Sequence, residues 1–280
     1  MKLASYIVDG NATFGVVAGD GIINATRCLG GRFSTLRQAL AADALEEVGR
    51  ATRGQTADHK LSDVKFLPVV PDPQRIVCVG INYRSHAEET GRDISPAPSV
   101  FLRLADTLVG HGGALVRPKV SDKFDFEGEL ALVIGRPSRH VAEADALKYV
   151  AGYTCFVDGS VRDYQKFSVT SGKNFPATAP LGPVLVTTDE IPDPTRLTLV
   201  TRLNGAEMQR SGTDMLIYSI PQVIKFVSDF THLAPGDIIA TGTPAGVGHR
   251  RTPPVWMKAG DVLEVEISGI GTLRNQVVDE

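Results

Sequence analysis

Residues 125 to 133 read DFEGELALV, the most informative stretch of the chain for its fold. Acidic residues alternate at its start, and an apolar run continues from Leu130 to Ile134. Side chains of a β-strand point to opposite faces in turn, so the pattern predicts a strand with Asp125, Glu127 and Glu129 on one face. The unbroken apolar run predicts that the second half of the strand is buried on both faces.

Carboxylates at alternate positions of a buried strand repel one another and lose hydration, which costs several kcal/mol each. A bound cation would offset this cost, because Mg²⁺, Mn²⁺ and Ca²⁺ all take oxygen ligands. A polar edge strand with a solvated acidic face would show the same pattern. The stretch by itself leaves both interpretations open.

The composition excludes several classes of protein. With 280 residues, 42% of them hydrophobic, and a net charge of −3, the chain is typical of a globular protein and has no basic surplus for a nucleic-acid partner. No apolar run approaches the roughly 20 residues that span a membrane, and the start does not resemble a signal peptide. The three scattered cysteines form no disulfide or zinc pattern, so we expect a cytoplasmic protein.

The first 70 residues form a small unit of their own in this pattern. Two alternating stretches, Leu3–Val8 and Thr13–Val17, flank a turn and predict a hairpin, and Ile22–Asn24 predicts a third strand. A helix is expected from Thr35 to Arg50, capped by Ser34. A proline-containing linker follows. We therefore expect a small N-terminal α/β domain at residues 1–70 and a main domain at residues 71–280.

A histidine and a glutamate follow the first strand of the main domain, which is expected at residues 75–80. If the next residues are helical, with Ser85 as N-cap, His86 and Glu89 lie on one face and in contact. A histidine held by a carboxylate can act as a general base near neutral pH. An exposed ion pair on a surface turn is the alternative interpretation.

Two further polar residues stand at positions that chemistry could use. Asp158 ends the apolar strand expected at residues 153–158, where it could join Glu127 and Glu129 as a cation ligand or act as an ordinary helix N-cap. Lys173 is predicted in a polar loop. It would be a solvated residue there or, beside a cation, a partner for a substrate carboxylate or an oxyanion.

The C-terminal part predicts a core helix that begins after Ser219 in a capping box with Gln222. The strand expected at residues 238–240 leads into the loop TGTPAGVG at residues 241–248. This loop could present backbone N–H groups to an anion, but it lacks the lysine of a P-loop, which excludes nucleotide binding of that kind.

Five motifs together resemble the fumarylacetoacetate hydrolase family, and in particular its acylpyruvate hydrolase-like branch. In order they are GINYRSHAEE (80–89), DFEGELALVIG (125–135), GYTCFVDGSVRDYQ (152–165), GKNFPATAPLGP (172–183) and TGTPAGVG (241–248). The resemblance covers residues 75 to 280. It implies an α+β fold with a mixed β-roll or sandwich body and a small N-terminal domain, and it implies a homodimer.

The resemblance also implies roles for particular residues. It makes Glu127, Glu129 and Asp158 metal ligands. It makes His86, Glu89 and Lys173 catalytic groups. The substrate contacts that it implies are Tyr83, Arg162, Gln165 and Thr243. One departure is notable. The founding members have a further metal-binding aspartate near the first motif, where this chain has Gly80–Asn82, so we expect water at that coordination position.

The implied activity is divalent-metal-dependent hydrolysis of a C–C bond in an acylpyruvate or related 2,4-diketo acid, in aromatic or sugar acid catabolism. The cofactor would be Mg²⁺ or Mn²⁺, with Ca²⁺ as a further candidate, and pyruvate and a carboxylic acid would be released. The same enolate chemistry would serve decarboxylation of oxaloacetate, or isomerisation or hydration of a muconate-type 2-oxo acid. A catalytically silent family member is the alternative from another class.

Overall fold

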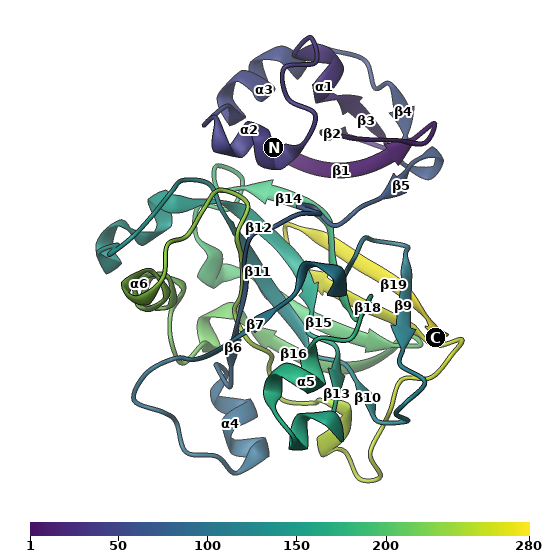
Figure 1. Ribbon diagram of the computed structural model, residues 1–280, viewed down its shortest axis with the longest axis vertical. Coiled ribbons are helices and arrows are strands. Elements are labelled where there is room, and N and C mark those ends of the chain that lie inside the picture. Colours follow the sequence, from purple (N-terminus) through teal and green to yellow (C-terminus); the bar gives the residue numbers. More distant parts are fainter.

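The computed structural model describes residues 1–280 and shows the mixed α+β fold that the sequence predicted (Figure 1). Its largest sheet has twelve strands. The continuous path through this sheet runs, in spatial order, β4 (His59–Lys60), β3 (Gly21–Asn24), β2 (Asn11–Ala18), β1 (Lys2–Val8), β14 (Ala179–Thr187), β12 (Val150–Val157), β11 (Gly128–Ile134), β17 (Ile238–Ala240), β6 (Ile76–Gly80) and β7 (Ser99–Arg103). The short strands β5 (Lys65–Phe66) and β8 (Leu108–Val109) pair with β1 and β14.

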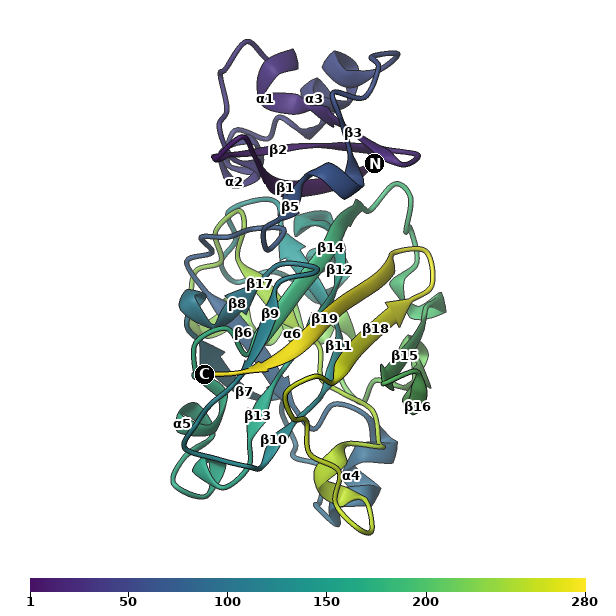
Figure 2. The ribbon, with the colours of Figure 1, turned by 90° about the vertical axis from the view of Figure 1, so that its right-hand side faces the viewer.

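A five-stranded sheet packs across the middle of the large one and makes the body a sandwich (Figure 2). Its spatial order is β16 (Ala206–Gly212), β15 (Thr198–Leu203), β18 (Val262–Ile267), β19 (Gly271–Asp279) and β9 (Ala114–Arg117). A two-stranded ribbon of β10 (Phe124–Asp125) and β13 (Ser160–Val161) lies at one end. The helices are α1 (Ala25–Cys28), α2 (Leu36–Ala41), α3 (Leu45–Thr52), α4 (Arg84–Thr90), α5 (Val169–Lys173) and α6 (Ile220–Phe230), and the 3₁₀ turns are η1 (Leu61–Asp63), η2 (Ala105–Thr107), η3 (Glu143–Tyr149), η4 (Tyr164–Lys166), η5 (Pro194–Arg196), η6 (Thr213–Met215) and η7 (Gly248–Arg250).

Strand β11 is the centre of the body, and both of its faces are buried as predicted. Leu130 and Leu132 belong to the core between the two sheets, whereas Ala131 and Val133 belong to a second core on the opposite face. The second core also takes in the apolar side chains of the N-terminal helices, so β11 is covered on both sides.

The acidic stretch before β11 is not one continuous strand, which corrects the sequence-based prediction. Asp125 ends β10, and β11 begins only at Gly128. Side chains take the backbone donors here, because Phe126 N–H donates to Asp125 Oδ1 at 2.8 Å and Gly128 N–H donates to Gln209 Oε1 at 3.0 Å. Even so, Asp125 and Glu127 both pair with Nη2 of Arg162, so the break in the strand does not separate their carboxylates.

The N-terminal residues form a compact unit of strands and short helices at one end of the molecule (Figure 1). The hairpin and third strand lie where the sequence predicted them, and β1 also pairs with β14 of the body. The expected helix from Thr35 to Arg50 is instead two helices, because Asp43 has a left-handed backbone with φ of 51°. Thr35 is the N-cap in place of Ser34.

Two other local predictions were wrong, whereas that for α6 was confirmed. Ser85 is not an N-cap, since α4 begins after Tyr83 without a side-chain cap. Lys173 lies at the end of helix α5 rather than in a loop. The capping box of Ser219 with Gln222 is present at the start of α6. None of the helices is both long enough and apolar enough to span a bilayer.

Candidate active site

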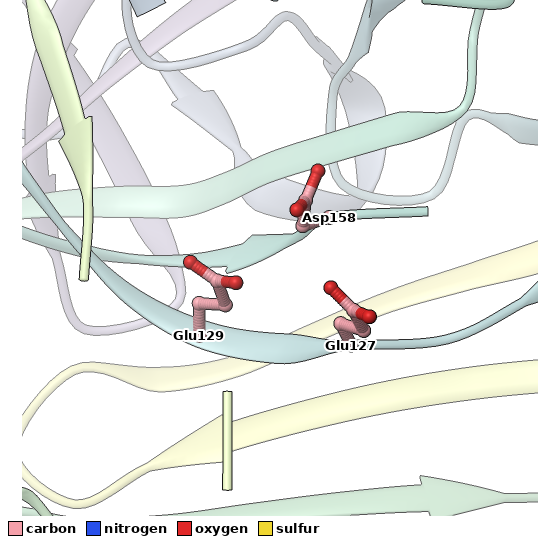
Figure 3. A group of neighbouring side chains, drawn as sticks. All are labelled: Glu127, Glu129 and Asp158. Carbon is pink, nitrogen blue, oxygen red and sulfur yellow. The ribbon is translucent and has the colours of Figure 1, made fainter. Parts of the chain in front are cut away.

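Three carboxylates meet where the start of β11 lies beside the end of β12 (Figure 3). Glu127, Glu129 and Asp158 come from the start of β11 and the end of β12, and Figure 3 shows their carboxylates pointing into one space. Their nearest oxygens all lie within 4.8 Å of one another, and all three side chains are buried. This grouping is the one that the sequence predicted.

The register of the sheet explains why these residues meet. Strands β11 and β12 are antiparallel, so the beginning of one lies beside the end of the other. Asp158 N–H donates to Glu127 O at 2.9 Å, which places Asp158 opposite Glu127 just beyond the ladder. Glu129 follows two residues after Glu127 and points to the same side.

Lys173 is buried against two of these carboxylates. Its Nζ lies 2.6 Å from Glu127 Oε2 and also forms an ion pair with Asp158. Burial alone would lower the pKa of Lys173, but the charges of Asp158 and Glu127 outweigh it and raise that pKa above its usual value. Lys173 is therefore a permanent cation inside the cluster and a poor general base.

Two arginines complete the cationic side of the cluster. Arg162 pairs with Glu127 and with Asp125, and Arg103 pairs with Asp158. Arg103 is fully buried on β7, donates to Thr178 Oγ1 at 2.7 Å and was missed in the sequence, where its strand appeared purely structural. A basic residue inside a predicted apolar strand was the one available signal.

Glu129 is the carboxylate that has no cationic partner. The cluster contains four carboxylates but only three cations. The carboxylates are Asp125, Glu127, Glu129 and Asp158, and the cations are Arg103, Arg162 and Lys173. Glu129 accepts only the Gly242 N–H, at 2.9 Å. Burial, together with the charges of Asp158 and Glu127, raises the pKa of Glu129 well above its usual value. By contrast, Lys173 and Arg162 outweigh burial at Glu127 and lower its pKa.

This donor set fits a hard divalent cation. The three residues offer only oxygen atoms, which suits Mg²⁺, Mn²⁺ or Ca²⁺ rather than a thiophilic metal. A cation would also supply the charge that Glu129 lacks. Asn82 does not replace a ligand aspartate, because its amide is taken up by Thr241 O at 2.8 Å and by Tyr218 N–H at 2.7 Å.

The predicted histidine and glutamate form a contact in helix α4. His86 Nδ1 lies 2.9 Å from Glu89 Oε2, and the other oxygen, Oε1, accepts the Gly246 N–H at 2.8 Å. Because the carboxylate only accepts, Nδ1 carries the proton and Nε2 keeps a free lone pair. His86 is 7% exposed, so it is a buried, oriented base rather than part of an exposed ion pair, and Glu89 is partly buried.

One cavity of about 540 Å³ joins these groups. Its lining includes these sequence-predicted residues: His86, Glu127, Glu129, Asp158, Arg162, Gln165, Lys173 and Thr243. Glu89 and Tyr83 lie behind the wall. The Tyr83 ring is fully buried and its hydroxyl has no hydrogen-bond partner, so it does not line the cavity where the resemblance implied a substrate contact.

Comparison with known proteins agrees with this geometry. Residues 75–278 match the model of the fumarylacetoacetate (FAA) hydrolase C-terminal domain, which is most of the chain. The chain belongs to the fumarylacetoacetate hydrolase family. The match covers the whole body and all five motifs, so the relationship implied by the motifs is confirmed.

Several members of the fumarylacetoacetate hydrolase family are close relatives. Rat mitochondrial oxaloacetate tautomerase Fahd2a is 39% identical over 238 residues, covering 84% of this chain and 76% of that protein. Oxaloacetate tautomerase YisK of Bacillus subtilis is 42% identical over 227 residues, covering 78% and 75%. The structure of maleylpyruvate hydrolase from Sphingobium sp. SYK-6 with manganese(II) and pyruvate superimposes with a TM-score of 0.85 at 29% identity, covering 100% and 99%. The chain is therefore an enzyme of this family, and its buried Glu127–Glu129–Asp158 cluster could hold a metal ion.

Proposed function

We propose that this protein is a divalent-metal-dependent tautomerase that interconverts the keto and enol forms of a 2-oxo acid such as oxaloacetate. The observation that carries the proposal is the placement of His86, with Nε2 free, in the same cavity as the Glu127–Glu129–Asp158 cluster. Relatives about 40% identical are oxaloacetate tautomerases, which supports this substrate. Keto–enol exchange needs one base and no water.

The side chains suggest how the proton moves. A divalent cation held by Glu127, Glu129 and Asp158 would polarise the 2-oxo acid group. His86 Nε2 takes a proton from C3, and the imidazolium then gives this proton to the carbonyl oxygen, so that the enol forms. The reverse transfers restore the ketone. Glu89 holds the imidazole in the correct tautomer and stabilises the imidazolium that forms.

Hydrolysis of an acylpyruvate is the second candidate, favoured by the size of the cavity. About 540 Å³ is within the range of drug-sized ligand sites and leaves room for an acyl group beyond a four-carbon acid. In this reaction His86 would deprotonate a water that attacks the distal carbonyl. The C–C bond then breaks and releases pyruvate and a carboxylic acid.

Ultraviolet absorbance of the enol form separates these two candidates. Enol oxaloacetate and acetylpyruvate are each mixed with the protein in Mn²⁺ and after chelation, and pyruvate is measured in the products. We expect metal-dependent loss of enol oxaloacetate without pyruvate release. Release of pyruvate and acetate from acetylpyruvate would instead identify the hydrolase, and failure on both substrates would contradict both candidates.

Replacing His86 tests the base directly. In His86→Ala the catalysed tautomerisation should fall by roughly 10²–10⁴-fold, the usual contribution of a general base. Mn²⁺ affinity should change little, because His86 is not part of the carboxylate cluster. His232→Ala, at an exposed position, is the control. A His86→Ala rate equal to that of the control would remove His86 from the reaction.

A further inference from the structure

The loop Thr241–His249, which follows β17, binds three carboxylates of the chain itself. Gly242 N–H donates to Glu129 Oε2 at 2.9 Å, and Gly246 N–H donates to Glu89 Oε1 at 2.8 Å. Gly248 N–H donates to Asp125 Oδ1 at 2.8 Å. The sequence predicted that this loop presents N–H groups to an anion, and the anions found here are side chains from three separate motifs. We call this segment the carboxylate-binding loop.

The backbone of the carboxylate-binding loop has little freedom to move. Gly246 has φ of 104°, and a Cβ there would lie 2.1 Å from Met208 O. A Cβ on Gly248 would lie 2.0 Å from Val255 O and 2.6 Å from Asp125 Oδ1. Only glycine fits these close approaches, so the loop is held at a fixed distance from the body.

Asp125 joins this loop to the carboxylate cluster. It is fully buried, and its Oδ2 accepts the His249 N–H at 3.0 Å while Oδ1 accepts the Gly248 N–H. Oδ2 also pairs with Arg162, at 2.8 Å from Nε and 2.7 Å from Nη2. Arg162 in turn pairs with Glu127. Neither the metal-ligand set nor the His86–Glu89 pair includes Asp125.

We infer that Asp125 is a positioning residue that sets the His86–Glu89 pair relative to the carboxylate cluster. On one side it orients Arg162, and through it Glu127. On the other side it fixes the carboxylate-binding loop, whose Gly246 N–H holds Glu89 and so aims His86. A proton transfer depends on this separation, because displacements near 1 Å cost large factors in rate. The inference holds for either reaction proposed above.

The test compares two buried aspartates. Asp125→Asn keeps the size of the side chain but removes the charge that pairs with Arg162. Asp237→Asn is the matched control, since Asp237 is also fully buried, accepts N–H groups of Arg75 at 2.9 Å and Ala234 at 2.8 Å, and pairs with the Arg75 side chain at 3.1 Å. Both variants should lose thermal stability. Only Asp125→Asn should alter the site.

The measurements are kcat, KM, Mn²⁺ affinity by calorimetry and the amide NMR signal of Gly246. For Asp125→Asn we expect kcat to fall about 10–100-fold, the usual effect of a group that orients a metal site, with KM changed less than about 3-fold. The Gly246 amide should shift in this variant and not in Asp237→Asn. Equal kcat in the two variants, or an unmoved Gly246 signal, would overturn the inference. If the wild-type protein acts on neither substrate, the proposed function fails, while the Gly246 amide signal still decides the role of Asp125.

Discussion

Glu129→Gln is expected to abolish divalent-metal binding and, at the same time, to make the metal-free protein more stable. Glu129 is 2% exposed and has no cationic partner, so its charge is a cost in the folded state without metal. Glutamine keeps the size of the side chain and can still accept the Gly242 N–H. Calorimetry with Mn²⁺ should show no saturable binding, and the melting temperature in chelator should rise, by roughly 2–4 °C for each kcal/mol gained.

The pH dependence of stability provides a second test of the cost assigned to the Glu129 charge. Because the folded protein raises the pKa of Glu129, it binds this proton more tightly than the unfolded chain does. The free energy of unfolding of the metal-free protein should therefore fall as pH rises from about 4.3, the pKa of an unfolded glutamate, through the raised pKa. In Glu129→Gln this fall should be smaller.

The control for Glu129 is a glutamate on a strand that faces solvent. Glu266→Gln removes a half-exposed carboxylate of the five-stranded sheet that pairs with Arg202. It should leave Mn²⁺ binding unchanged. Wild-type Mn²⁺ affinity in Glu129→Gln would disprove the ligand assignment, and a lowered melting temperature would disprove the cost assigned to its charge.

Lys173→Met should have the opposite effect on the metal-free protein. Removing this cation leaves Glu127 and Asp158 buried beside each other without their shared partner. Breaking a buried pair in this way typically costs about 3–5 kcal/mol. Mn²⁺ should restore the lost stability, because a cation that binds only the folded state stabilises it and replaces the missing positive charge.

Activity and affinity should separate in Lys173→Met. We expect kcat to fall, because the cavity loses the cation nearest to Glu127 and Asp158, while Mn²⁺ affinity stays the same or rises. The matched control is Lys225→Met, which removes an exposed lysine paired with Asp229 at 2.7 Å and should change neither quantity. If Mn²⁺ does not restore the melting temperature of Lys173→Met, a bound cation does not replace the charge of Lys173.

The sequence predicted most strands because their signals are local. Alternation, the apolar run of β11 and the turns of the N-terminal hairpin each involve neighbouring residues. The errors arose where distant groups compete for the backbone. At the start of β11, the Gln209 side chain accepts the Gly128 N–H, and no local pattern reveals this bond. The break between helices α2 and α3 depends instead on one residue, Asp43, which has a left-handed backbone.

The candidate site was predicted in part for the same reason. The motifs identified Glu127, Glu129 and Asp158 as one cluster, and the structure brings them together. The burial of Lys173 and the presence of Arg103 could not be predicted, since both depend on pairing across the fold with Asp158. Charged side chains of strands and helices are normally solvated, so the sequence pattern alone predicts them at the surface.

The pairing of β1 with β14 has a consequence for any attempt to isolate the body. Strand β1 lies between β2 and β14 and pairs with β14 at Lys2 opposite Val186 and Leu3 opposite Leu185, so it covers an edge of the body. Deleting residues 1–70 would uncover that edge and the apolar surface beneath it, and exposed edges recruit other chains. The N-terminal unit therefore protects the body against aggregation. We expect a protein that lacks residues 1–70 to precipitate, although every motif of the cavity is retained.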